Sequence, residues 1–527
     1  MGSEFASIVL LECRSSLWRN ASTSNGWISF SLLHEICLSF LVLLMKTFLR
    51  CTCLLLLLTA SGVARLELQA EEFLFDLVIQ GGRVLDPESG LDAIRDIGLL
   101  DGGIAAVSET PLNGREIIDA RGLVVAPGFI DLHQHAFDEE SIRLKALDGV
   151  TSILELETGT AEVQHWYRER EGTSRLHHGV SIGHMPVRMK VMGDPPSFLP
   201  KSDSLGATQP ASLDQLESMR QSLRRGLEEG AVAVGFGIAY TPAATDAEIR
   251  SLFAVAAEQR ASCHVHLRGR REAAVEETRW LAEVSAATGA PLHIVHMQAT
   301  GGRATPELLR LVEESRSAGL DLTCEVYPWT AGMTEIQSHL FNPGWEARYG
   351  IGYEDLQWGA TGERLNAESF ARFRRIGGLV IVHSNTEATV TEAVAHRLTM
   401  IASDGLPGHP RNAGTYAKIL GHYVRERGVL DLRTALTKMS LMPAQRLEAR
   451  VPDLRKKGRI QVGCHADVVI FDAATVGSPA TYERATQPSQ GIAWVLVGGV
   501  AVVREGQLVE NVRPGRAIRA PRPADIH

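Results

Sequence analysis

The sequence predicts an α/β protein: a (β/α)8 TIM barrel with a small β-sandwich domain built from both ends of the chain. Apolar strand-like runs alternate with helix-like stretches through the middle of the chain, and hairpin-like runs open and close it. Buried apolar strands that alternate with helices form parallel βα units, and about eight such units make a closed barrel. A set of histidines and acids follows these runs, so the barrel is expected to carry a site.

The β-domain is predicted from short alternating runs separated by Gly, Asp and Pro. DLVIQGGRVLDPESG opens the chain after its leader, and GRIQVGCHADVVIFD and GIAWVLVGGVAVVREGQLV close it. Runs of this kind form hairpins. We therefore expect residues 71–127 and 455–520 to pair into one domain, with the barrel formed by residues 128–454.

Eight runs are the expected barrel strands, separated by stretches such as DQLESMRQSLRRGLEEG and TPELLRLVEESRSAG that have the pattern of helices. The runs are LVVAPGFIDLH, VTSILELE, AVAVGFG, SCHVHL, PLHIVHM, LDLTCEVYP, GLVIVHS and LTMIASD. Active sites of such barrels lie at the C-terminal ends of the strands. The residues that end each run are therefore the candidates for chemistry.

The first 70 residues are predicted to be a cloning-derived leader and a signal peptide. MGSEF is typical of a cloning scar, and Lys46 and Arg50 precede the apolar run Leu54–Leu58 and small residues, with cleavage expected after Ala64 or Ala70. The two cations interrupt the apolar stretch, which disfavours a membrane anchor. We expect an exported protein, periplasmic or secreted, without a stable membrane span in its mature chain.

Composition excludes several other classes. The 527 residues contain 53 Lys and Arg against 62 Asp and Glu, a formal charge of −9 that offers no basic face to nucleic acid. Of seven cysteines only Cys263, Cys324 and Cys464 lie outside the leader, which is too few for a disulfide framework. The expected partner is a small molecule, and the sequence leaves a homo-oligomer open.

Two histidines one residue apart end the first expected strand, in GFIDLHQH. His133 and His135 share one strand face, although such a pair alone is often only packed or exposed. Three further runs end in His266, His296 and Asp404. Imidazole nitrogens and a carboxylate at neighbouring strand ends form a ligand set for zinc, and the set predicts one or two ions.

Two acids lie inside the second expected strand, ILELETG. Glu155 and Glu157 share a face and are costly to bury unless a cation meets them. Two neighbouring metals need a bridging ligand, and we favour Glu157 for that role because it lies nearer the C-terminal end. Glu155 is the alternative bridge, and an ion pair with a neighbouring strand is the alternative for both.

Several stretches resemble the amidohydrolase superfamily and, more narrowly, the N-acyl-D-amino-acid deacylases (D-aminoacylases). They include APGFIDLHQH, GHMPVRMKVMG, GAVAVGFGIAYTP, HVHLRG, IVHMQ, CEVYPWTAG and SDGLPGHPRNAGTYAKILG. The resemblance implies an enzyme that cleaves the amide of an N-acyl-D-amino acid. It implies one metal on His133 and His135, a second on His266 and His296, and proton transfer by Asp404.

The substrate of such an enzyme carries a carboxylate, which an arginine fork recognises by paired hydrogen bonds. Arg411, in HPRNAG, matches the family position expected to do so. Arg188, Tyr240 and Tyr327 are further candidates for substrate contact, with surface arginine or core tyrosine as the alternative for each.

The sequence departs from the family pattern at two positions. Relatives usually place a cysteine ligand where GVTSILELETG has Thr158, and many carry lysine where this chain has Gln298, near the substrate. The alternatives are another amide, dipeptide or cyclic-amide hydrolase of the superfamily, or a non-catalytic binding protein. Carbamate-bridged members of the superfamily carry a lysine on strand four, and GAVAVGFGIAY, the region expected to correspond to it, has none. A binding protein would have lost a ligand or Asp404.

Overall fold

The computed structural model describes residues 75–522, so the predicted leader lies outside the described residues. Within this range no helix is long and apolar enough to cross a membrane. Cys263, Cys324 and Cys464 are buried and unpaired, in agreement with the prediction that they form no disulfide framework.

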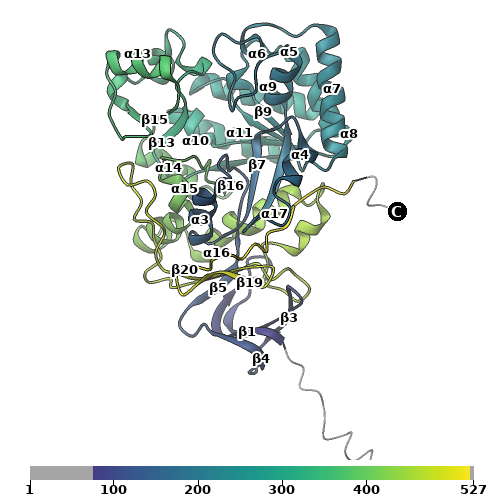
Figure 1. Ribbon diagram of the computed structural model, residues 1–527, viewed down its shortest axis with the longest axis vertical. Helices are drawn as coiled ribbons and strands as arrows, with labels where there is room; N and C mark the ends of the chain where they lie inside the picture. The colour runs from purple at the N-terminus through teal and green to yellow at the C-terminus, as the bar shows by residue number, and fades with distance from the viewer. Residues whose placement is uncertain (1–74, 523–527) are drawn as a thin grey trace, which may run out of the picture. The chain divides into compact units, whose positions relative to one another are not determined.

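Eight parallel strands form the predicted barrel (Figure 1). They are β6 (Phe129–Asp131), β7 (Val150–Thr160), β8 (His177–Gly183), β9 (Val234–Gly237), β10 (Cys263–His266), β11 (Leu292–Ile294), β12 (Leu322–Val326) and β16 (Thr399–Ile401). The strands neighbour one another in this order. The residues that follow the outer strands β6 and β16 also pair: His135 N donates to Gly405 O at 3.1 Å, and Gly405 N donates to His133 O at 3.3 Å. These bonds join the ends of the first and last strands, which brings their site residues together.

One predicted barrel strand is wrong. GLVIVHS contains β15 (Leu379–His383), which pairs antiparallel with β13 (Ala331–Glu335) and β14 (Leu356–Trp358) in a separate three-stranded sheet. The missing barrel strand is β8, whose sequence HHGVSIG opens with two histidines and contains two glycines. Apolar content alone favoured β15, although it belongs to an insertion between β12 and β16.

Helices separate the strands. They are α3 (Glu139–Leu147), α4 (Val163–Arg168), α5 (His184–Met192), α6 (Leu205–Thr208), α7 (Leu213–Glu228), α8 (Asp246–Glu258), α9 (Glu272–Thr288), α10 (Met297–Gly301), α11 (Thr305–Ser317), α12 (Trp345–Tyr349), α13 (Ala367–Ile376), α14 (Glu387–Ala395), α15 (Arg411–Lys418), α16 (Leu432–Leu436) and α17 (Met442–Leu447). In α7 a capping box between Ser212 and Gln215 starts the helix. Its buried residues Met219, Leu223 and Leu227 recur every four positions, so one face packs on the barrel.

Both chain ends contribute to a separate nine-stranded sheet, which confirms the predicted pairing of the ends; Figure 1 shows its purple and yellow strands side by side. The strands are β1 (Phe75–Leu85), β2 (Asp92–Leu100), β3 (Gly103–Ser108), β4 (Gly114–Asp119), β5 (Val124–Pro127), β17 (Val468–Phe471), β18 (Ile492–Val497), β19 (Val500–Arg504) and β20 (Gln507–Leu508). The halves meet where β5 pairs antiparallel with β17. Because β5 leads directly into β6, this sheet also fixes the start of the barrel.

The last described segment leaves this sheet and runs along the barrel. Ile518 N donates to His178 O at 2.7 Å, and Ala520 N donates to Gly230 O at 3.0 Å. The sequence predicts that residues up to 520 belong to the β-domain, since so short an extended segment carries no periodic signal of the strand edge that it meets.

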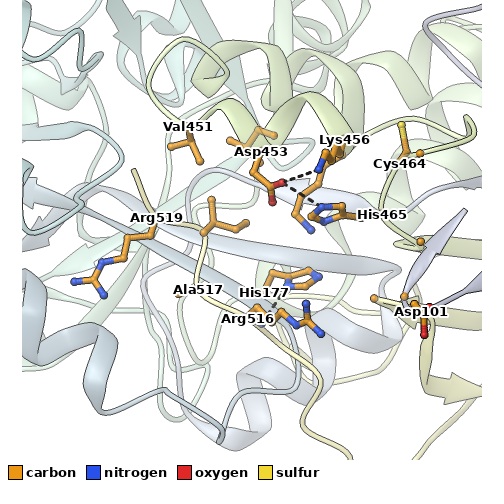
Figure 2. Close-up of a pocket in the computed structure, with 17 residues that line it drawn as sticks. Asp101, His177, Val451, Asp453, Lys456, Cys464, His465, Arg516, Ala517 and Arg519 are labelled. Carbon is orange, nitrogen blue, oxygen red and sulfur yellow. Dashed lines mark hydrogen bonds and ion pairs between the residues drawn. The ribbon is translucent and has the colours of Figure 1, made fainter. Parts of the chain in front are cut away.

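A buried ionic cluster lies where the sheet meets the amino end of β8. Asp467 Oδ1 is 2.9 Å from His177 Nε2 and accepts from Gly498 N at 2.8 Å, and Lys457 Nζ pairs with the other oxygen. A cavity of about 370 Å³ lies beside it, with His177, His465 and Arg516 in its lining (Figure 2). The cavity adjoins the amino end of β8, whereas the histidines that end the strands lie at the carboxyl ends.

Asp467→Asn is expected to lower the free energy of unfolding by about 3 kcal/mol at pH 7, because breaking a buried pair leaves Lys457 without its counter-charge. Burial raises the pKa of Asp467, but His177 and Lys457 hold it well below its usual range. Its contribution is therefore present above the ordinary carboxyl pKa and is lost as the pH falls through the lower folded value. Urea unfolding at several pH values measures both effects.

Asp453→Asn is the matched control, since Asp453 is 59% exposed and pairs with His465 at 3.3 Å. It is expected to change stability by less than about 0.5 kcal/mol. Equal effects of the two variants would contradict the role assigned to the Asp467 cluster.

Candidate metal centre and active site

Because successive side chains of a strand face opposite sides, the histidines at the strand ends face the mouth of the barrel. In β10, Cys263 and Val265 belong to the apolar core shared with the helices, whereas His264 and His266 occupy the other face. His296 and Asp404 follow β11 and β16 and adopt left-handed backbone, with φ of 30° and 51°. Non-glycine residues rarely do so, and such strain gathers at functional sites.

Two imidazoles and two carboxylates form the first group. His133 Nε2 and His135 Nε2 are 3.0 Å apart, and Glu157 Oε2 is 2.7 Å from His133 Nε2. Asp404 Oδ1 lies 3.2 Å from His135 Nε2 and 3.6 Å from His133 Nε2. All four side chains thus direct one atom each to a common point.

Glu157 also belongs to a second group. Its Oε1 is 2.8 Å from His266 Nδ1 and its Oε2 is 3.5 Å from His296 Nε2, while the two imidazole nitrogens are 3.1 Å apart. Within each group the ligand atoms lie within 4.8 Å of one another. Nitrogen and carboxylate donors that converge in this way fit a divalent ion such as zinc, and Glu157 is placed to serve two ions.

Glu155, the alternative bridge, lies outside both groups. Its Oε2 is 2.7 Å from His135 Nδ1, the ring nitrogen that faces away from the cluster, and its Oε1 accepts from Thr158 N at 3.0 Å. The strand bulges beyond Glu155 and crosses Gly235 of β9, where a Cβ atom would lie 2.2 Å from Glu157 O. The geometry therefore favours Glu157 as the shared residue, with Glu155 orienting an imidazole.

Glu325, on β12, was missed by the sequence analysis. Its Oε1 is 2.5 Å from His133 Nδ1 and its Oε2 is 3.1 Å from His293 Nε2. His264 packs on His293 with ring centroids 4.5 Å apart, so both histidines lie beside the cluster rather than in it. The signal was present: Glu325 is an acid inside the apolar run LTCEVYP, as Glu157 is in ILELETG.

Glu325→Gln is expected to weaken metal binding by about 10- to 100-fold, because a carboxylate behind a ligating imidazole fixes its tautomer and ring orientation. Competition with a chromophoric chelator measures the affinity without relying on activity. Glu448→Gln is the control, since this acid pairs with Arg459 at 2.7 Å, away from the cluster. Unchanged affinity in Glu325→Gln would refute this orienting role.

Electrostatics favours a cation at this cluster. Burial opposes ionisation of Glu157, yet His266, His133 and His135 hold its pKa well below the usual range. Burial would lower the pKa of His133, but Asp404, Glu325 and Glu157 raise it to about 10. The carboxylates thus place a negative potential at the imidazole nitrogens, where a divalent ion would be stabilised.

Predicted substrate residues adjoin the cluster. Arg411 Nη1 is 2.8 Å from Asp404 Oδ2, and its guanidinium lies over the Tyr327 ring at 4.9 Å. Gln298 Nε2 donates to Tyr327 O at 2.9 Å, and the Tyr240 ring is 5.0 Å from that of His266. Within the described chain, the buried polar atoms without a hydrogen-bond partner include Tyr327 OH, Gln298 Oε1 and Arg411 Nε. They are available to a polar ligand.

Arg188 is not brought to this group. It lies on α5, where its guanidinium pairs with Glu248 of α8, donates to Gly206 O at 2.8 Å and also donates to Gln209 O. The sequence could not reveal this ion pair. Whether an arginine lies at the surface, in the site or in a buried ion pair depends on its partner, which here is Glu248 of α8. The expectation that Arg188 contacts substrate gains no support.

A (β/α)8 barrel with carboxylates and histidines converging at its strand ends has the architecture of a metal-dependent hydrolase. The model of the amidohydrolase family matches residues 197–509. The chain is 31% identical over 499 residues to N-acyl-D-glutamate deacylase from Alcaligenes xylosoxydans xylosoxydans, covering 84% of this chain and 96% of the relative. It is 28% identical over 502 residues to D-aminoacylase of the same organism, covering 85% and 99%.

The fold agrees with a solved relative. The crystal structure of N-acyl-D-glutamate deacylase from Bordetella bronchiseptica, complexed with zinc and a phosphonate inhibitor, superimposes with a TM-score of 0.74 at 26% identity, covering 85% of this chain and 100% of that chain. A crystal structure of D-aminoacylase gives 0.73, also at 26% identity, with 84% and 100% covered. The chain belongs to the amidohydrolase family, and it is a metal-dependent amidohydrolase of the group related to D-aminoacylases.

Proposed function

We propose that the enzyme is a zinc-dependent hydrolase that cleaves N-acyl-D-amino acids into a free D-amino acid and a carboxylate. The observation that carries the proposal is the position of Asp404, 3.2 Å from His135 Nε2 and 2.8 Å from Arg411 Nη1. This position supports the proposal, because it would bring a proton acceptor and a cation able to bind a carboxylate to the same cluster of candidate metal ligands. The names of the relatives support the substrate class.

His133, His135, Glu157, His266, His296 and Asp404 are the residues proposed to hold one or two zinc ions. Bound zinc would polarise the amide carbonyl and make water more acidic. Glu325 and Glu155 hold the imidazoles of His133 and His135 by their outer nitrogens, which leaves both Nε2 atoms directed at the cluster. The protein therefore supplies a preformed set of donors.

Asp404 is proposed to move the proton. Burial would raise its pKa, but Arg411 and His133 hold the pKa below its usual range, so the carboxylate is ionised and ready to accept. It would take a proton from the attacking water and return it to the departing amine nitrogen. Its only slight exposure keeps bulk water from competing for that proton.

The substrate carboxylate is proposed to bind beside Arg411. Tyr327 OH and Arg411 Nε are buried without partners in the described structure, and Gln298 offers an amide from the neighbouring strand end. A carboxylate is an acceptor that satisfies both the hydroxyl and the guanidinium. Tyr240 is proposed to approach the substrate from the side of His266.

A matched panel of N-acetyl-D- and N-acetyl-L-amino acids tests the proposal. The purified enzyme with zinc is expected to release free amino acid from the D series selectively, as measured by amine derivatisation. Release from neither series would overturn the proposal, and dipeptides and cyclic amides would then be the next substrates to assay. Equal release from both series would contradict the D preference.

We also propose that the first 70 residues direct export to the periplasm or beyond. The basic, apolar and small-residue order described above supports this. Expression in a bacterial host followed by N-terminal sequencing is expected to find a mature chain that begins after Ala64 or Ala70. An unprocessed chain retained in the cytoplasm would contradict it.

A further inference from the structure

We propose that the enzyme has a second binding site, at the amino end of the barrel, which takes a small soluble molecule that carries a phosphate group. The site is a cavity of about 630 Å³, and we call it the arginine cavity. Its volume lies within the range of small-molecule sites, about 300 to 1,000 Å³. Its lining contains Arg168, Arg513, Arg516, Arg519 and Arg522.

The arginine cavity is separate from the metal cluster. His178, in its lining, is the second residue of β8, whereas Gly183 ends that strand on the side of the barrel mouth. From His178 to Gly183 the strand advances by five residues. That is about 16 Å of extended backbone. A ligand in this cavity would therefore not contact the metal ligands, and it need not be the substrate.

The lining of the arginine cavity is strongly basic. Among the described residues it contains five arginines against one acid, Glu171. The whole chain carries a formal charge of −9, so this excess of cations is local. A guanidinium donates paired hydrogen bonds in the geometry that phosphate oxygens accept, and an arginine cluster is therefore suited to a phosphate group.

Two of these arginines have no partner for their side chains. Arg168 is the last residue of α4, Arg516 lies in the last described segment, and both are exposed. Within the described chain neither guanidinium makes a hydrogen bond or an ion pair. By contrast, Arg513 Nη2 lies 3.3 Å from Glu139 Oε1. The charges of Arg168 and Arg516 are thus available to an anion.

The segment that carries four of the arginines is held against the barrel. A Cβ atom on Gly515 would lie 2.1 Å from Leu176 O, so only glycine allows the backbone to approach so closely. Further along, Arg519 Nε donates to Glu229 O at 2.9 Å. Because the lining is already ordered, binding would cost little additional conformational entropy.

A buried imidazole in the lining also lacks a partner. His178 is 1% exposed, and its Nε2 has no hydrogen-bond partner in the described chain. Its Nδ1 lies 3.4 Å from Leu176 O, but that oxygen already accepts from Ser174 Oγ at 2.6 Å. Burial lowers the pKa of His178 to about 4, so the ring is neutral at neutral pH and can carry its proton on Nε2. A phosphate oxygen would accept that hydrogen bond.

The neighbouring cavity of about 370 Å³ is less suited to an anion. Arg516 and Arg519, labelled in Figure 2, belong to both linings. In the smaller cavity, however, Asp453 lies 3.3 Å from His465 Nε2 and 3.8 Å from Lys456 Nζ. These cations already have a counter-charge, so a phosphate group gains less there than beside Arg168.

Calorimetric titration of the zinc-loaded enzyme with glycerol phosphate tests the proposal. It is carried out at low ionic strength, because salt screens exposed charges. We expect one saturable site for glycerol phosphate and no binding of glycerol, which lacks the phosphate group. The absence of saturable binding of glycerol phosphate would overturn the proposal.

Arg516 is the residue to change first. Arg516→Glu is expected to weaken binding of glycerol phosphate by about 100-fold, and Arg516→Lys and Arg168→Ala by about tenfold each. Lysine keeps the charge of arginine but loses its paired donors. Arg279→Ala is the control, since this arginine is 51% exposed on α9 and lies 3.9 Å from Glu276. Its affinity for glycerol phosphate is expected to equal that of the parent.

Unchanged binding in Arg516→Glu would contradict the proposal, because the ligand would then lie elsewhere, for example at the metal cluster. The unfolding temperature of each variant is measured alongside, and Arg516 is exposed, so the substitution is expected to leave the fold intact.

Vesicles distinguish a soluble ligand from a lipid headgroup, which can carry the same phosphate group. The enzyme is expected to stay in the supernatant when vesicles of phosphatidylcholine and phosphatidic acid are sedimented. Retention on these vesicles that Arg516→Glu abolishes, together with no binding of glycerol phosphate, would show a headgroup site and overturn the proposal of a soluble ligand.

Discussion

Asp404→Asn is expected to lower kcat by about 10² to 10⁴-fold at saturating zinc, because an amide cannot accept the proton that the carboxylate takes from water. The loss should appear in kcat rather than in KM, since the substrate carboxylate is proposed to be held by Arg411. Asp404 lies 3.2 Å from His135 Nε2 and is also a candidate metal ligand. Zinc content must therefore be measured in the same preparation.

Asp321→Asn is the control for this change. Asp321 precedes β12 at its amino end and pairs with Arg446 at 2.6 Å, far along the strand from the cluster. It is expected to retain nearly full activity. If Asp404→Asn binds zinc fully and keeps activity within about threefold of the parent, Asp404 does not transfer the proton in the way proposed here.

Glu157→Gln is expected to weaken zinc binding by at least about 100-fold and to abolish activity at low zinc, because the variant loses the one carboxylate shared by both histidine groups. The Glu157 oxygens lie 2.7 Å from His133 Nε2 and 2.8 Å from His266 Nδ1, so both groups depend on it. The neutral amide would also remove negative charge that offsets four imidazoles. Metal analysis after dialysis against a weak chelator measures the loss.

Glu155→Gln provides the matched comparison, since it removes a charge two residues away on the same strand. Among the histidines of the cluster, Glu155 pairs with His135, at 2.7 Å from its outer nitrogen, and its other oxygen accepts from Thr158 N. A loss of about tenfold is expected, smaller than that of Glu157→Gln. A larger loss in Glu155→Gln than in Glu157→Gln would reverse the two roles and revive Glu155 as the bridge.

The fold was largely predictable from periodicity. Alternating βα units and hairpin runs predicted the barrel and the sheet of both chain ends, because burial imposes these patterns locally. The limit of periodicity as a predictor is shown by β15, which was predicted to be a barrel strand in the place that β8 occupies. GLVIVHS is a strongly apolar run that pairs antiparallel in an insertion, whereas HHGVSIG is a barrel strand with little apolar signal. Which strands neighbour one another depends on distant contacts that no local pattern records.

The site was predictable where strand ends carry a chemical signal. Strand ends predict the ligands His133, His135, His266, His296 and Asp404, and Glu157 is predicted as an acid inside a strand. The structure brings these six residues within two overlapping groups. The same reasoning misses Glu325, and the predicted contact of Arg188 with substrate gains no support from its pairing with Glu248. An arginine gives no sign of its partner, and Glu325 lies inside a run interpreted only as a strand, although its buried carboxylate needs a partner as much as that of Glu157 does.

Zinc titration of the metal-depleted enzyme, with release of D-methionine from N-acetyl-D-methionine as the readout, tests the central claim most directly. We expect negligible activity without metal and activity that appears as one or two equivalents of zinc bind. Activity that is independent of metal, or zinc binding that produces no hydrolysis of any N-acyl-D-amino acid, would contradict it.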